Sequence, residues 1–344
     1  MTEIRRRRLQ LRPYAGRQAS RALVVRDAAF DRLAALRIPE PPAAGPTWVL
    51  DSNLQRAITV RWPRHYAWPP TSAWLDPLLH GMRKLVRVDM ADIPQPHQGV
   101  VFIQFVMYGR SHVIGIDYSD LSGISQAGVN SCELYFKMQF AREGYRWDHI
   151  VPGGYPAKNE ILYHILGKAR QVRAQSRFAH DVYGRFGLEH GAETRERAVS
   201  LLSADTRFGF HGGLEPIRYT RSLDEVARSR VCVDMPGKGS FCFRLVDYLA
   251  VGSCIVGPPH RTAMPIPLID GTHLAQCRDD LSDLADLCAH LATHEDQRER
   301  LAANARAYFD SYLHREQLSR YYLFHCVRRF GWPTIAGQGD ATGA

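Results

Sequence analysis

The sequence predicts an α/β protein with two domains, and two observations carry this prediction. Residues 230–257 have the pattern of a strand, a glycine-containing loop, a helix and a second strand, which is the order of a parallel βαβ unit. From Gly99 onward, runs rich in β-branched residues alternate with stretches of helical periodicity. A chain of 344 residues is long enough for two domains of ordinary size, each with its own core.

The βαβ unit is the clearest part of the chain. Residues 231–233 form a short apolar run that stops before Pro236, as expected for a buried strand that ends in a turn. A helix is predicted from about Phe241 to Gly252, because a glycine is the usual residue at a left-handed helix end. Residues 254–256 are predicted to form the next strand. The loop of such a unit lies at the carboxyl edge of the sheet, where these sheets bind ligands.

The loop and the helix carry charges that suit a phosphorylated ligand. The loop contains Gly237, Lys238 and Gly239. Arg244 and Asp247 are three residues apart, so a helix places both on one face. Free N–H groups at the helix start, together with Lys238 and Arg244, suit a phosphate or diphosphate, and the carboxylate suits a ribose or sugar diol. The alternative is an exposed Arg244–Asp247 ion pair beside an ordinary loop.

The same stretch resembles the donor-site segment of GT-B glycosyltransferases. In those proteins a glycine loop opens a helix of the form E-A-L-A-x-G, followed by a strand such as P-V-V, and residues 247–252 and 253–256 are the counterparts here. Arg244, three residues before the acid, is similar to the R-x-x-E arrangement of exostosin-like and related bacterial glycosyltransferases. The resemblance implies that the acid, here Asp247 instead of the usual Glu, contacts the nucleotide ribose, with Arg244 near the diphosphate. It covers about the C-terminal half of the chain and implies two Rossmann-like domains that face a cleft.

A second strand–turn–helix unit precedes this segment. Residues 178–183 are predicted to form its strand, and residues 194–202 its helix. The resemblance implies that the glycine turn after the strand faces the donor phosphates, which makes Gly184 and Arg185 donor-binding candidates. His211 lies at the end of the next strand and is a catalytic candidate, although a lone histidine is more often structural.

Two carboxylates mark the N-terminal half. Asp117 and Asp120 follow the predicted strand 112–116, at the position where open α/β sheets carry functional groups. An inverting transferase needs a base from this side of the cleft, and either residue is a candidate for that base. The alternative is that one of them only caps the following turn. A retaining enzyme is the alternative that does not require such a base.

The predicted domains are residues 1–168, an acceptor-side domain with an irregular N-terminal segment, and residues 169–344, the donor-binding domain. A short helix is predicted at 27–36, ahead of a proline cluster, and the tail after Trp332 is predicted to be frayed. The resemblance further implies that a final helix, residues 315–329, returns to the first domain.

Composition limits the partners and the location. The formal charge of +9 favours anionic partners, namely nucleic acid, an anionic membrane surface or a nucleotide-diphosphate donor. No nucleic-acid-binding signature is present, so no nucleic acid is expected as a partner. The arginines at 5–8 are predicted to form a solvated tail, with a peripheral membrane contact as the second alternative. Without a secretory signal or a long apolar run, we expect a cytoplasmic protein, with peripheral contact at the inner membrane face as the variant.

Several other chemistries have no motif in this sequence. The seven cysteines contain no C-x-x-C pair, and no D-x-D pair resembles the metal site of a GT-A enzyme. There is neither a P-loop nor a G-x-S-x-G motif. We therefore expect no metal and no cofactor other than the nucleotide-diphosphate sugar that serves as co-substrate.

These observations predict a metal-independent glycosyltransferase of polysaccharide or glycoconjugate biosynthesis. It would move a sugar from a nucleotide-diphosphate donor to a hydroxyl of a sugar, lipid-linked or protein acceptor. Lys238, Arg244, the helix start and Arg185 would stabilise the leaving diphosphate. The alternative is a non-catalytic GT-B-like binding protein, because the acid is Asp247 and the N-terminal half resembles nothing specific. A third hypothesis is a basic nucleic-acid binder, whose affinity would fall steeply with salt.

Overall fold

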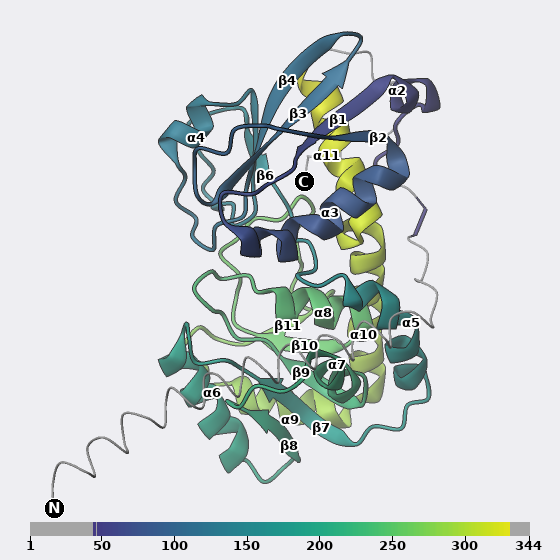
Figure 1. The fold of residues 1–344 in the computed structure, drawn as a ribbon. Coiled ribbons are helices and arrows are strands. Elements are labelled where there is room, and N and C mark those ends of the chain that lie inside the picture. The colour runs from purple at the N-terminus through teal and green to yellow at the C-terminus, as the bar shows by residue number, and fades with distance from the viewer. Residues whose placement is uncertain (1–43, 46, 331–344) are drawn as a thin grey trace, which may run out of the picture.

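The computed structural model describes residues 44–45 and 47–330 and contains two α/β domains, one above the other in Figure 1. Each domain is built on its own sheet, of six strands in the first and five in the second. The predicted helix at 27–36, the arginines at 5–8 and the tail after Trp332 lie outside the described residues. Within the described residues, no helix combines the length and apolar character needed to cross a membrane.

The first sheet has the strand order β2-β1-β3-β4-β5-β6. Its strands are β1 (Ile58–Pro63), β2 (Arg87–Ala91), β3 (Val100–Met107), β4 (Arg110–Asp117), β5 (Leu134–Lys137) and β6 (Ile150–Pro152). The β3–β4 pair is a hairpin whose two turn residues, Tyr108 and Gly109, both have positive φ, as a type I′ turn requires. β3 is antiparallel to its two neighbours, whereas the other pairs are parallel. The carboxyl ends of β1, β4, β5 and β6 therefore share one edge.

The second sheet is fully parallel, with the order β8-β7-β9-β10-β11. Its strands are β7 (His180–Arg185), β8 (Phe210–Gly213), β9 (Ser229–Val233), β10 (Cys254–Gly257) and β11 (Ala275–Gln276). The chain moves outward from β7 to β8 and then returns past β7 to β9. This reversal creates a crevice between the carboxyl ends of β7 and β9, which is where doubly wound sheets bind their ligands.

Helices cover both faces of the second sheet. α6 (Ala192–Ala204), which follows β7, packs with α9 (Leu284–Thr293) on one face. α5 (Ile161–Ala174), α7 (Tyr219–Ala227) and α8 (Phe243–Val251), which follows β9, pack together on the other. Because the helices after β7 and β9, α6 and α8, lie on opposite faces of the sheet, neither of them covers the crevice between these strands. This confirms the predicted Rossmann-like character of the second domain.

The α8 helix forms as the sequence predicts. Gly252 adopts φ +81 and ends the helix in the left-handed conformation. Leu245 and Leu249 on its inner face are fully buried, and each contributes about 1.5–3 kcal/mol through removal from water. Cys242 at the other end makes no side-chain cap, although its backbone carbonyl accepts a hydrogen bond from the N–H of Leu245 at 3.1 Å.

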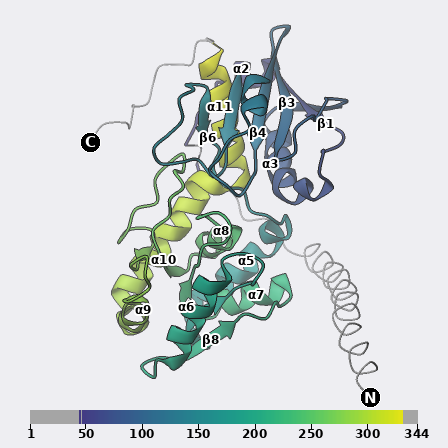
Figure 2. The same ribbon diagram turned by 90° about the vertical axis from the view of Figure 1, so that its left-hand side faces the viewer.

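The last helix crosses back to the first domain, as expected. α11 (Arg315–Arg329) packs on α3 (Ser72–Leu85), and Ser319 donates a hydrogen bond to the carbonyl of Leu78 at 3.0 Å. The helices approach closely at Gly81, where a Cβ atom would overlap the carbonyl of Arg315. Figure 2 shows α10 (Glu295–Tyr308) and α11 following one another from the lower domain to the upper one. The predicted fold class, with two facing α/β domains and a returning helix, is confirmed.

The remaining elements are short. They are the helices α2 (Ser52–Ala57) and α4 (Gln126–Asn130), the 3₁₀ turn η1 (Pro69–Thr71) and the π-helical turn η2 (Phe309–Leu313) between α10 and α11. Lys168, where the sequence analysis divides the domains, lies within α5, which contacts α7 and α8 of the second domain. The chain passes between the two sheets in residues 153–160.

Candidate donor and acceptor site

Two loops form the crevice of the second sheet, and one arginine joins them. The guanidinium of Arg195, on α6, donates to the carbonyl of Gly187 at 2.5 Å and to that of Pro236 at 3.0 Å. Gly191 has φ +68, and a Cβ at this position would lie 3.1 Å from the Pro236 carbonyl. The loop after β7 and the loop after β9 are thus fixed side by side as one surface.

Arg244 forms its ion pair with Asp234, not with Asp247 as in the alternative of the sequence analysis. Its Nε donates to Oδ1 of Asp234 at 3.2 Å, and its Nη2 lies 3.1 Å from the same oxygen as an ion pair. Nη2 donates its hydrogen bond to the Met235 carbonyl at 2.6 Å. Its guanidinium carbon lies 4.8 Å from the ring centre of Phe186. Burial disfavours the charge, but the Asp234 carboxylate outweighs it and raises the pKa of Arg244. Among the described residues nothing bonds Nη1, so this donor is available to a ligand.

Asp247 lies on the same helix face and makes no ion pair with Arg244. Oδ1 accepts a hydrogen bond from the hydroxyl of Tyr219 at 2.8 Å, and no described residue bonds Oδ2. The carboxyl keeps some exposed area, but the surrounding protein removes most of its water. Burial therefore raises the pKa of Asp247 to about 7, against the Tyr219 hydrogen bond and the charges of Arg244 and Lys158.

The glycine loop touches both domains. Lys238 is exposed and makes no hydrogen bond or ion pair with a described residue. A Cβ at Gly237 would lie 3.0 Å from Nη2 of Arg195, and a Cβ at Gly239 would lie 2.6 Å from the carbonyl of Asp120. The amide of Gln139, in the first domain, donates to the Phe241 carbonyl at 2.7 Å. The structure thus brings Gly237, Lys238 and Gly239 to the space between the domains.

The structure places Arg185 and His211 in a separate cluster around Glu225 of α7. Arg185 bonds the Glu215 carbonyl at 3.0 Å and Glu225 at 3.4 Å, and His211 lies 3.5 Å from Glu225. Burial favours the protonated carboxyl, but Arg185, His211 and Arg221 outweigh it and lower the pKa of Glu225. β7 continues through Arg185, so the turn expected to begin at Gly184 starts later.

His211 and Gly184 also have packing contacts. The His211 ring stacks on His180 with centres 3.8 Å apart, and burial together with His211 lowers the pKa of His180. A Cβ at Gly184 would lie 2.8 Å from the Phe186 ring. Gly184 thus lies within β7 and packs against Phe186. It is next to the crevice but is not part of the loop that lines it.

Asp117 and Asp120 differ sharply in their surroundings. Asp117 is 2% exposed and binds the ammonium of Lys137 at 3.0 Å, the hydroxyl of Tyr135 at 2.6 Å and the backbone N–H of Ser119 at 2.9 Å. This is the geometry of the capping alternative. Asp120 is half-buried, and of the residues that the structure describes only Tyr155 bonds its carboxylate, through its hydroxyl at 3.2 Å. Of the two, Asp120 has the carboxylate that a substrate could reach.

Lys158, which the sequence analysis did not single out, lies between the domains. Its Nζ is 4.4 Å from the ring centre of Phe243, the first residue of α8, and 5.1 Å from that of Trp74 on α3. These two rings meet edge to face at 4.6 Å. The sequence does contain a signal for the position of Lys158. Residues 152–156, just before it, are rich in glycine and proline, and such a segment after a strand indicates a connection at the edge of the sheet.

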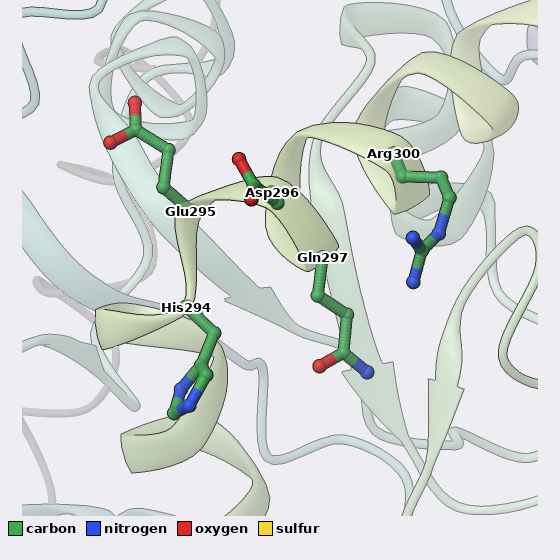
Figure 3. Close-up of a pocket in the computed structure, with 5 residues that line it drawn as sticks. All are labelled: His294, Glu295, Asp296, Gln297 and Arg300. Carbon is green, nitrogen blue, oxygen red and sulfur yellow. The ribbon is translucent and has the colours of Figure 1, made fainter.

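One surface hollow lies away from the crevice (Figure 3). It has a volume of about 290 Å³ and is lined by His294, Glu295, Asp296, Gln297 and Arg300 at the junction of α9 and α10. Arg230, at the start of β9, bonds the nearby Ala292 carbonyl, so this junction is at the opposite edge of the sheet from the crevice. Its lining is polar and its acidic residues already face a helix N-terminus, so we place the functional site at the crevice instead.

The described residues contain no group of three or more His, Cys, Asp or Glu side chains placed to hold a metal ion. The expected independence of a metal stays a prediction from the sequence.

No known protein family and no curated protein matches this sequence. Among solved structures, Anabaena Alr3699/HepE in complex with UDP and glucose is 14% identical, with a TM-score of 0.42 over 62% of this chain and 70% of that one. TarM is 9% identical, with a TM-score of 0.39 over 60% of this chain and 47% of TarM. The C-terminal domain of the Francisella tularensis glycosyl transferase group 1 family protein LpcC is 14% identical, with a TM-score of 0.29 over 45% of this chain and 93% of that domain.

These structural matches are to proteins of the GT-B glycosyltransferase fold, at low sequence identity. This chain spans about half the length of TarM. The assignment of the fold itself rests on the two sheets and the helix that returns from the second domain to the first.

Proposed function

We propose that this protein is a glycosyltransferase that uses a nucleotide-diphosphate sugar. The observation that carries the proposal is the placement of Arg244 and Asp247 on one face of α8, at the crevice between β7 and β9. Arg244 keeps a permanent positive charge with Nη1 unused, and Asp247 keeps Oδ2 unused. A cation and a carboxylate one helical turn apart match a ligand that joins a diphosphate to a diol.

In the proposed reaction, an acceptor hydroxyl attacks the anomeric carbon of the donor. The bond from that carbon to the diphosphate breaks, and the diphosphate leaves with the electron pair. Arg244 and the exposed Lys238 stabilise the charge that develops on it. Asp120 takes the proton of the acceptor hydroxyl in an inverting enzyme, because its carboxylate lies on the opposite side of the interdomain space.

The test is ligand-dependent thermal stabilisation with UDP, GDP, ADP and CDP. One diphosphate at a hundredfold excess over its Kd should stabilise the wild type by about 2.7 kcal/mol. Arg244→Lys, which keeps the charge opposite Asp234 but loses the planar fork, and Asp247→Asn should both reduce this effect. Arg87→Met is the control, because Arg87 starts β2 at the edge of the sheet away from the crevice. A folded protein that no diphosphate stabilises would refute the proposal.

The non-catalytic alternative makes a different prediction with the same ligand. It allows diphosphate binding but no release of sugar from the donor. The protein is incubated with the common sugar derivatives of the best-binding diphosphate, and the free nucleoside diphosphate is measured. Release no faster with the wild type than without protein would favour the binding protein.

A further inference from the structure

Lys158 lies where four segments of the two domains meet. It belongs to the connection 153–160, and its ammonium is over the rings of Trp74 from α3 and Phe243 from α8. The carboxylates close enough to act on its charge are Asp120, Asp247 and Glu189. They come from the loop after β4, from α8 and from the loop after β7, so Lys158 faces both the acceptor side and the donor side of the cleft.

The contacts hold the ammonium without neutralising it. Aromatic faces attract a cation through the ring quadrupole, and they leave its N–H groups available to an anion. No described carboxylate forms an ion pair or hydrogen bond with Lys158, although the three named above act at longer range. Lys158 as a whole is exposed, but the protein around its ammonium removes part of the water there and lowers the pKa of Lys158, and these carboxylates oppose that effect. An anion bound beside the ammonium would therefore favour its charged form.

The α8 face shows where such an anion would lie. Phe243 and Asp247 are one turn apart on this face, and the charges of Lys158 and Arg244 both act on the Asp247 carboxyl. Two cations thus act on one carboxylate, one from the interdomain connection and one from α8 itself. A nucleoside diphosphate has a matching layout, with anionic oxygens for the cations and hydroxyls for the carboxylate.

We propose that Lys158 is a second cationic contact to the donor diphosphate, supplied by the connection between the domains. This inference rests on the proposed function. A lysine suits this role because its ammonium is a compact charge with three donors that can follow the oxygens of a leaving group. Lys158 would then be a catalytic residue that acts on the departing diphosphate together with Arg244.

Titration calorimetry tests this contact. The diphosphate that stabilises the wild type best and the monophosphate of the same base are titrated into wild type, Lys158→Met and the control Lys168→Met. Lys168 is an exposed lysine of α5, ten residues further along the chain. Loss of a charge-assisted contact should weaken diphosphate binding about tenfold in Lys158→Met but monophosphate binding less than about threefold. The control should bind both ligands as the wild type does.

Lysine acetylation of the wild type gives the same answer without a mutation, in case Lys158→Met does not fold. Because a bound diphosphate would cover the amine of Lys158, it should lower the rate of Lys158 acetylation by about threefold or more. The rate at Lys168 should not change. Two results would overturn the Lys158 contact while the proposed function stands. One is that Lys158→Met weakens the binding of diphosphate and monophosphate equally; the other is that bound diphosphate does not slow the acetylation of Lys158. Wild type that binds no diphosphate would overturn both proposals.

Discussion

Arg244 and Asp234, ten residues apart in the sequence, form a bridge across the turn between β9 and α8, with Nη2 of Arg244 3.1 Å from Oδ1 of Asp234. Asp234 is 1% exposed, and its other oxygen, Oδ2, is buried without a hydrogen-bond partner. The bridge uses Nε and Nη2 of Arg244, and within the described part of the chain no residue bonds Nη1. Asp234 is therefore a positioning residue for Arg244.

Replacing Asp234 should destabilise the protein and weaken ligand binding together. Asp234→Asn leaves the buried Arg244 charge without its counterion, and we expect a loss of about 3 kcal/mol in the free energy of unfolding. Arg244→Met alone should cost a similar amount, because it leaves the Asp234 carboxylate uncompensated. The double variant should lose less than the sum of the two, by about 1 kcal/mol or more. Urea denaturation measures all three, and strictly additive losses would contradict the coupling.

Asp247 should make stability depend on pH. Its pKa is raised from 3.8 in the unfolded chain to about 7 in the folded protein, so the folded state holds the proton more tightly. The contribution of Asp247 is fully present below about pH 4 and is lost as pH rises to about 7. Asp247→Asn removes this dependence, so its stability relative to wild type should increase between pH 4 and pH 8. Parallel stability curves for the two proteins over that range would refute the shifted pKa.

The ionisation of Asp247 should also be visible in ligand binding. An ionised carboxylate is the better acceptor for ribose hydroxyls, so the preference for a ribonucleoside diphosphate over its 2′,3′-dideoxy analogue should increase from pH 6 to pH 8. The comparison of two ligands with the same diphosphate cancels the titration of the phosphates themselves. In Asp247→Asn this preference should be small at every pH.

The parts predicted correctly from the sequence have strong local signals. The β9–α8–β10 unit was predicted because an apolar run, a Pro–Gly turn and a helix-ending glycine follow one another within one stretch. Arg244 and Asp247 were found by their spacing, which a helix converts directly into a shared face. β2 was missed because its residues are half-buried or exposed throughout, so no apolar alternation marks a strand that pairing with β1 creates.

The parts that were missed depend on contacts distant in the sequence. No local pattern shows that Lys158 meets rings from α3 and α8, because the two domains must first be packed together. Asp234 did have a local signal, since it directly follows the buried strand β9 at the ligand-binding edge of the sheet. The pairing of Arg244 with Asp234 instead of Asp247 could not be predicted from spacing, because both acids are within reach of its side chain.

Gly239 should be required for closure of the glycine loop on the first domain. A Cβ there would overlap the Gln139 amide and approach the Asp120 carbonyl to 2.6 Å. We expect Gly239→Ala to cost about 1–3 kcal/mol of stability, as overpacking does, and to weaken diphosphate binding. Gly123→Ala is the matched control, because a Cβ there meets nothing within 4 Å, and it should change stability by less than about 0.5 kcal/mol. Equal stability of the two variants would mean that the loop can move away from the first domain at no cost.

Asp117 and Asp120 should separate stability from catalysis. Asp117→Asn leaves Lys137, which is 0% exposed, without its counterion, so we expect a loss of about 3–5 kcal/mol in the free energy of unfolding. Asp120→Asn keeps a polar side chain next to the Tyr155 hydroxyl and should fold almost as stably as the wild type. If Asp120 is the base, its amide variant should bind the diphosphate normally but transfer sugar about 10²–10⁴-fold more slowly. Unchanged transfer by Asp120→Asn would exclude this carboxylate as the base and favour a retaining mechanism.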